Sequence, residues 1–105
     1  MDREYFLEIA PGVMIFVQFK PVRGNIKEFV VKLLCEFSGK WHEVLRYDGG
    51  HGCPHKDILD PSGRVIRKIW YDFLSNSQAL TMAIADMKDN YEFYRERYLK
   101  WLKGN

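Results

Sequence analysis

The sequence predicts an α+β domain in which an antiparallel sheet of about five strands packs against one long C-terminal helix. Three observations predict it. Residues 13–47 contain stretches of alternating apolar and polar side chains, turn-forming residues separate the stretches, and residues 75–103 repeat apolar side chains at helical spacing. The 105 residues suit one domain, spanning 1–105.

The first predicted hairpin follows from alternation with period two. Three stretches have this alternation: residues 13–20, 26–37 and 41–47. A three-residue turn between the second and third stretches sets Phe37 opposite Trp41 and Leu33 opposite Leu45. In this register four polar side chains share the face opposite the core: Lys32, Glu36, His42 and Arg46.

A second hairpin is predicted around residues 60–63. The sequence Asp-Pro-Ser-Gly has the residue preferences of a type I turn, so residues 55–59 and 64–70 become its two arms. Pairing across this turn sets Asp57 opposite Arg67, and His55 lies on the same face.

The C-terminal helix is predicted from its start signal and its periodicity. Ser75 and Gln78 have the spacing of a capping box, and Gly104 ends the helix. Apolar side chains recur at steps of three and four: Leu80, Ile84, Met87, Tyr91, Tyr94, Tyr98 and Trp101. We expect this stripe to pack on the sheet. Because a helix of about 27 residues outreaches strands of about 8 residues, its tyrosine-rich end is the alternative interface of a homo-oligomer.

Composition and charge limit the classes of protein. No apolar run approaches the roughly 20 residues that cross a bilayer, and the acidic start lacks the features of a signal peptide, so we expect a cytoplasmic protein with no membrane partner. Two cysteines are too few for a disulfide framework. A net charge of +2 does not by itself indicate a nucleic-acid-binding protein.

Residues 47–57 are the segment where chemistry is expected. They hold two of the three histidines and three of the eight glycines. Histidine exchanges protons near neutral pH, and glycine lets backbone amides approach an anion. The candidate catalytic residues are His51, His55, Asp57 and Arg67, and the candidate binding residues are Tyr47, Asp48, Gly50, Gly52, Lys56 and Arg46.

The pattern Tyr-Asp-x-x-His-Gly-x-Pro-His-x-Asp in this segment resembles a small uncharacterised prokaryotic family, over roughly residue 41 to the C-terminus. It is more distantly similar to the TumE-like toxins of toxin–antitoxin modules, which also combine strands, a Tyr-Asp motif, a Gly/His-rich segment and a final helix. Tyr47, Asp48, His51 and His55 match those toxins, whereas Asp57 stands where they usually carry another histidine. The resemblance implies RNA as a ligand and an antitoxin-like protein as a partner.

Three interpretations of the segment stay open. In the first, the protein is a metal-independent endoribonuclease, a hydrolase or phosphotransferase without a cofactor. His51 and His55 act as general acid and base, and Asp57 orients His55. Arg67, with Lys56 or Arg46, neutralises the phosphate.

The second and third interpretations need no catalysis by histidine. Four side chains of the segment are acceptable zinc ligands: His51, Cys53, His55 and Asp57. Alternatively, the glycines form only a tight connection, and an Asp57–Arg67 ion pair holds the hairpin of a non-enzymatic binding or assembly module.

Overall fold

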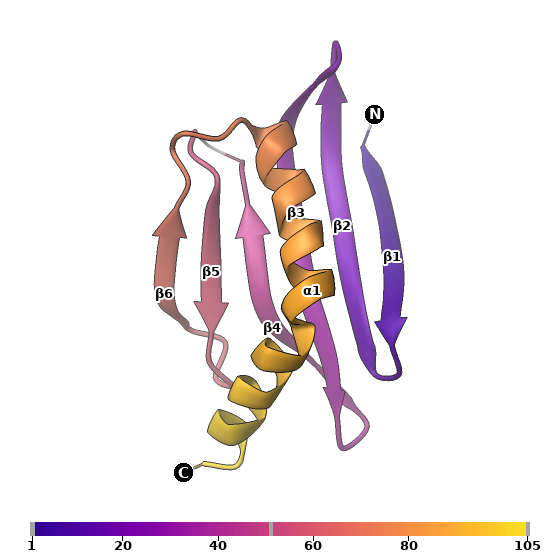
Figure 1. Ribbon diagram of the computed structural model, residues 1–105, viewed down its shortest axis with the longest axis vertical. Coiled ribbons are helices and arrows are strands. Elements are labelled where there is room, and N and C mark those ends of the chain that lie inside the picture. Colours follow the sequence, from indigo (N-terminus) through magenta and orange to yellow (C-terminus); the bar gives the residue numbers. More distant parts are fainter. Residues whose placement is uncertain (1, 51, 105) are drawn as a thin grey trace.

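The computed structural model describes residues 2–50 and 52–104, and it has one antiparallel sheet with one helix on it (Figure 1). Six strands lie side by side in chain order. Their bounds are β1 Arg3–Ala10, β2 Val13–Val22, β3 Asn25–Phe37, β4 Lys40–Asp48, β5 His55–Leu59 and β6 Val65–Trp70, and α1 spans Asn76–Leu102. The predicted α+β class is confirmed. Within the described residues, no helix is long and apolar enough to cross a bilayer.

The sheet has six strands because β1 was not predicted. β1 forms one edge of the sheet and pairs only with β2. Its first four residues are exposed, and Tyr5 and Phe6 stand next to each other as large exposed side chains. The second half of β1 packs against the core through Leu7, Ile9 and Ala10, but the adjacent apolar residues Tyr5 and Phe6 interrupt the alternation of apolar and polar side chains that reveals the inner strands.

The predicted helix start is confirmed in detail. Ser75 Oγ accepts a hydrogen bond from the Gln78 backbone N–H at 3.1 Å, and Gln78 Oε1 accepts one from the Ser75 backbone N–H at 2.9 Å. These bonds satisfy two backbone donors at the helix start. Gly104, with φ of 73°, follows the last turn.

The apolar stripe of α1 packs on the sheet. The helix runs diagonally over β3 and β4 (Figure 1). Three predicted members of the stripe, Leu80, Ile84 and Tyr91, are partly buried against the core, whereas Trp101 is exposed. The buried side chains of the helix are Ala79, Ala83, Met87, Tyr94 and Tyr98. Tyr98 is only 3% exposed and stacks on Phe37 with 5.8 Å between ring centroids, so this tyrosine belongs to the core of its own domain.

The helix also joins the sheet at its first residue. Asn76 Nδ2 donates hydrogen bonds to the carbonyl oxygens of Ile26, Lys27 and Gly49 at 2.9–3.2 Å. Gly49 is buried beneath this contact, and a Cβ atom there would collide with Asn76 and with the Phe29 ring. Glycine therefore allows the start of the connection between β4 and β5, here called the motif loop, to pass under the helix.

The predicted pairing of β3 with β4 is correct in its middle and wrong near the turn. Leu33 pairs with Leu45, as predicted. The turn, however, has two residues with positive φ, Ser38 and Gly39, which pair Phe37 with Lys40 and not with Trp41. A bulge at Val44 absorbs the extra residue. It turns His42 to the helix side, away from the predicted polar face, where His42 Nδ1 lies 3.2 Å from the Tyr98 hydroxyl.

The two cysteines should differ in reactivity. Burial raises the pKa of the Cys35 thiol to about 11, although the charge of Arg95 acts in the opposite direction. The unfolded thiol ionises near 9.0, so the folded state holds its proton more tightly than the unfolded state does. The stability that this difference contributes is present below pH 9.0 and is lost as the pH rises from there toward the folded pKa. We expect iodoacetamide at about pH 8 to modify Cys53 in the native protein and Cys35 only in urea. Equal modification of both thiols without urea, seen by peptide mass spectrometry, would contradict the burial of Cys35.

Candidate functional site

The helix-free face of the sheet carries two neighbouring rows of side chains that cross all six strands. The residues of each row are directly paired from one strand to the next, and directly paired residues lie on the same face of the sheet. One row is Phe6, Phe16, Lys32, Arg46, Asp57 and Lys68, and the other is Glu4, Gln18, Val30, Asp48, His55 and Trp70. The candidate residues Arg46, Asp48, His55 and Asp57 therefore lie together on β4 and β5.

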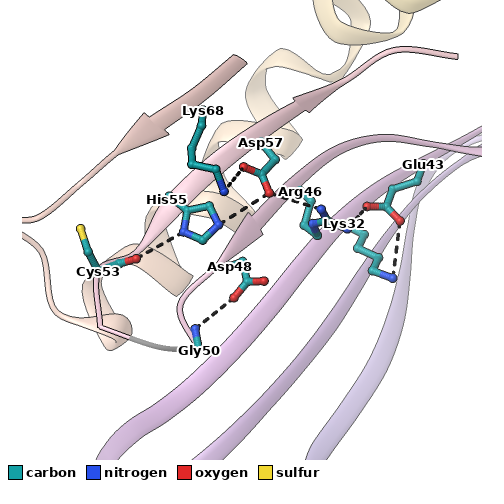
Figure 2. Close-up of polar contacts among 9 residues, drawn as sticks. All are labelled: Lys32, Glu43, Arg46, Asp48, Gly50, Cys53, His55, Asp57 and Lys68. Atoms are coloured by element: carbon teal, nitrogen blue, oxygen red, sulfur yellow. Dashed lines mark hydrogen bonds and ion pairs between the residues drawn. The ribbon is translucent and has the colours of Figure 1, made fainter. Parts of the chain in front are cut away.

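Asp57 is the centre of this group (Figure 2). It is only 2% exposed although it lies on the face without a helix. Its Oδ2 atom lies 3.3 Å from Arg46 Nη2, and its Oδ1 atom lies 3.2 Å from Lys68 Nζ. The Lys68 contact lacks the direction of a hydrogen bond, so Oδ1 has an ion pair only. One buried carboxylate thus holds two cations in place.

The row of charges continues to β3. Arg46 Nη1 lies 3.1 Å from Glu43 Oε2, and Lys32 Nζ lies 3.5 Å from Glu43 Oε1. These outer contacts are partly exposed and contribute little to stability individually. Their effect is to orient Arg46 between two carboxylates.

The His55 ring is oriented by contacts at both of its nitrogens. Nδ1 lies 3.3 Å from the Cys53 carbonyl oxygen, and Nε2 lies 3.6 Å from Asp57 Oδ2. A carbonyl oxygen only accepts, so the bond at Nδ1 requires the proton to be on that nitrogen. In the neutral ring the lone pair is then on Nε2, the nitrogen that faces Asp57. The Trp70 ring supports the other side of His55, with 5.0 Å between centroids.

The prediction that Arg67 faces Asp57 is wrong. Leu59 pairs with Val65 next to the turn, but an extra residue in β6, Ile66, then shifts the register by one. Asp57 consequently pairs with Lys68, and Arg67 turns to the helix side of the sheet. Lys68 takes the position that was predicted for Arg67.

The motif loop is described only in part. His51, a predicted catalytic and metal-binding residue, lies outside the described residues. Asp48 Oδ1 accepts a hydrogen bond from the Gly50 backbone N–H at 3.0 Å, and Gly52 has a positive φ of 98° that suits glycine. Asp48 and Gly50 also line a hollow of about 260 Å³ together with Gln18, Lys20, Glu28 and Val30, among others.

The predicted metal ligands do not converge in the part that is described. The Cys53 sulfur points away from the His55 ring (Figure 2), and it lies 3.4 Å from the Pro54 carbonyl oxygen. Across residues 2–50 and 52–104, no three side chains of His, Cys, Asp or Glu are grouped to hold an ion.

Two predicted binding residues, Tyr47 and Lys56, lie on the helix side and join a network that sequence analysis missed. Asp86 of α1 accepts hydrogen bonds from the hydroxyls of Tyr47 and Tyr94, each at 2.7 Å. Lys56 Nζ donates to the Tyr94 hydroxyl at 2.8 Å and lies 3.4 Å from Asp86 Oδ2. The only signal in the sequence was a charged residue, Asp86, one position before Met87 in the apolar stripe.

The network shifts the pKa values of Asp86 and Tyr47. Burial acts to raise the pKa of Asp86, but hydrogen bonds from Tyr47, Tyr94 and Asn90 and the charge of Lys56 hold it below its usual value of 3.8. Burial and the bond to Asp86 raise the pKa of Tyr47 far above its ordinary value. A closed set of satisfied partners anchors the helix to β4 and β5, and it is separated from His55 by the sheet.

A family with the description "Domain of unknown function (DUF7718)" matches residues 1–104 of the chain. No curated protein and no solved structure matches it.

Proposed function

Because the chain belongs to the DUF7718 family, whose function is unknown, we propose a function from the site itself: the protein cleaves RNA without a metal ion, using His55 and His51. The observation that carries the proposal is the buried Asp57 carboxylate, which holds His55, Arg46 and Lys68 on one open face of the sheet. A proton acceptor beside two cations is what the cleavage of a phosphodiester requires.

In the proposed reaction, His55 Nε2 takes the proton of a ribose 2′-hydroxyl. The 2′-oxygen forms a bond to the adjacent phosphorus, and the bond from phosphorus to the 5′-oxygen breaks. His51 gives a proton to that leaving oxygen, so the products are a 2′,3′-cyclic phosphate and a 5′-hydroxyl. The bond between Nδ1 and the Cys53 carbonyl supports the role of His55 as base, since in the neutral ring it leaves the lone pair on Nε2.

Lys68 and Arg46 supply the positive charge in this proposal. The Lys68 side chain is 38% exposed and retains N–H donors beyond its contact with Asp57. Both cations are held before substrate binds, so they lose little freedom when a phosphate approaches. The adjacent Trp70 ring, which is 56% exposed, offers a surface on which a base can stack.

His55→Ala should lower the rate of RNA cleavage by about 100-fold or more, because general base catalysis contributes roughly that factor. The rate is measured with a labelled single-stranded RNA, and the products are checked for the cyclic phosphate. His42→Gln is the matched control, because His42 is a partly buried histidine on the opposite side of the sheet. The control should cleave at the rate of the parent.

Two outcomes would refute the catalytic proposal. One is parental activity in the double variant His51→Ala, His55→Ala. The other is loss of activity in EDTA with recovery on adding zinc, which would favour the metal interpretation of the loop.

The proposal also includes where the protein acts and which partner restrains it. A toxin-like ribonuclease would act on RNA in the cytoplasm and would be restrained by an antitoxin-like partner. Expression of the parent should then inhibit growth, and the double histidine variant should not. A homo-oligomer through the helix is also part of the proposal, and the mass of the protein in solution tests it. Because Tyr98 is buried in its own core, that interface would have to use exposed residues such as Leu102.

A further inference from the structure

A cluster of cations and aromatic rings lies on the helix side of β6, away from His55. Arg67 lies on the helix side of β6, Arg97 lies beside exposed rings of α1, and the charge of Arg67 acts on Arg97. We propose that this surface, the Arg67–Arg97 surface, binds single-stranded RNA. In naming RNA the inference rests on the proposed function, but binding can be measured without cleavage.

Arg97 is held by three aromatic rings of its own helix. Its guanidinium carbon lies 5.2 Å from the ring centroid of Phe93, 5.4 Å from that of Tyr94 and 5.2 Å from that of Trp101. These positions are three and four residues from Arg97, so they share one face of the helix. The rings fix the guanidinium plane, and the buried Nε atom has no hydrogen-bond partner.

No carboxylate neutralises this surface in the part of the chain that the structure describes. Seven other side chains of Lys, Arg or His form the ion pairs found there, and neither Arg67 nor Arg97 is among them. Burial lowers the pKa of Arg97, Tyr94 acts to raise it, and the charge of Arg67 lowers it again. Two like charges that are near each other and unpaired repel, and an anion bound between them would remove that repulsion.

The chemistry around the two arginines suits RNA better than a second copy of the chain. A guanidinium donates two parallel hydrogen bonds to a phosphate, and bases stack on aromatic rings whatever their sequence. Phe93 is 62% exposed and Trp101 is 37% exposed, so ring surface is open beside the cations. Two copies meeting at this surface would bring four unpaired guanidinium groups together.

The edge strand β6 connects this surface to the candidate site. Successive residues of a strand point to opposite faces, so Arg67 lies on the helix side while its neighbour Lys68 contacts Asp57 on the helix-free side. β6 is the edge strand at the end of the sheet opposite β1. An RNA bound at Arg97 and Arg67 can therefore cross this edge and reach His55.

The test measures binding of a labelled RNA of about 12 nucleotides to the full chain by fluorescence anisotropy. The RNA carries 2′-O-methyl groups, which prevent cleavage through a 2′-hydroxyl. The double variant Arg67→Gln, Arg97→Gln should bind at least tenfold more weakly, and the slope of log affinity against log salt should decrease by about 0.7 for each phosphate that the variant no longer neutralises. Phe93→Ala should weaken binding about fivefold, because it removes a ring on which a base can stack.

Two variants control for a general loss of positive charge and for misfolding. Arg95→Gln removes the same charge from the same helix, but Arg95 lies over Phe37 and pairs with Glu96, so it should bind like the parent. Arg67→Gln alone changes an exposed residue outside the ring cluster, so it should fold normally and bind severalfold more weakly. The double arginine variant should cleave a dinucleotide at the parental rate.

The outcomes separate the two proposals. Undiminished binding by the double arginine variant, no binding by the parent, or an equal loss in Arg95→Gln would overturn the RNA surface. A dimer that Arg97→Gln dissociates would also overturn it, since the surface would then be an interface between copies. Binding that depends on the arginines without any cleavage would leave the RNA surface supported and remove only the catalytic role of His55.

Discussion

Asp57→Ala should lower the free energy of unfolding by about 3 kcal/mol, measured by urea denaturation. The carboxylate is 2% exposed and neutralises Arg46 and Lys68. Without it, Lys68 loses its counter-charge and Arg46 keeps only Glu43. The expected loss is at the lower end for a broken buried ion pair, because the side chains of Arg46 and Lys68 are 29% and 38% exposed and can turn toward water.

Glu43→Ala is the control for this prediction. Glu43 belongs to the same row of charges and contacts two cations, but its side chain is 26% exposed. Removing it should cost less than about 1 kcal/mol. Equal losses in the two variants would mean that Asp57 is no more than another surface ion-pair partner, and its proposed role in orienting His55 would lose its basis.

Asp86→Ala should destabilise the protein by about 3 kcal/mol. Asp86 accepts hydrogen bonds from Tyr47, Tyr94 and Asn90 and lies 3.4 Å from Lys56 Nζ. Its removal leaves the buried Tyr47 hydroxyl without an acceptor and Lys56 without a counter-charge. The helix should then hold less firmly to β4 and β5, which chemical denaturation detects.

The pH dependence of stability gives an independent measurement of the same network. The pKa of Asp86 is lowered in the folded protein, so its ionised form contributes stability that is present above the unfolded value of 3.8. That contribution is lost as the pH falls through the lower, folded pKa. Asp86→Asn should therefore flatten the decline of stability below about pH 4, whereas Asp89→Asn, an exposed change on the same helix, should leave it unchanged. A parental decline in Asp86→Asn would show that other carboxylates cause it.

Elements with strong local signals were predictable from the sequence. The capping box of Ser75 and Gln78 and the long apolar stripe depend on residues three and four apart, so they mark a helix before any tertiary contact forms. The arm His55–Leu59 was likewise predictable from the turn at Asp60. The edge strand β1 was not predicted, because the adjacent apolar residues Tyr5 and Phe6 interrupt its alternating pattern.

Only some of the residues that meet at the candidate site were predictable from the sequence. Alternation along the chain places Asp57 and His55 on one face of their strand, and the structure adds Arg46 from the neighbouring strand β4. It does not bring Arg67 or His42 to them, because single extra residues at Ile66 and Val44 turn everything beyond them to the opposite face. Whether a strand accommodates such a bulge depends on packing across the sheet, which a local pattern does not contain.

By itself, the sequence determined the class of the fold, the position of the helix and the segment that carries the histidines, since each depends on the spacing of residues near one another in the chain. The tertiary structure alone decided that Lys68 replaces Arg67 beside Asp57, and that Tyr47 and Lys56 meet Asp86 behind the sheet. The physical reason is that the side of a sheet on which a residue lies depends on the register of the whole ladder, and one bulge reverses it for every residue beyond.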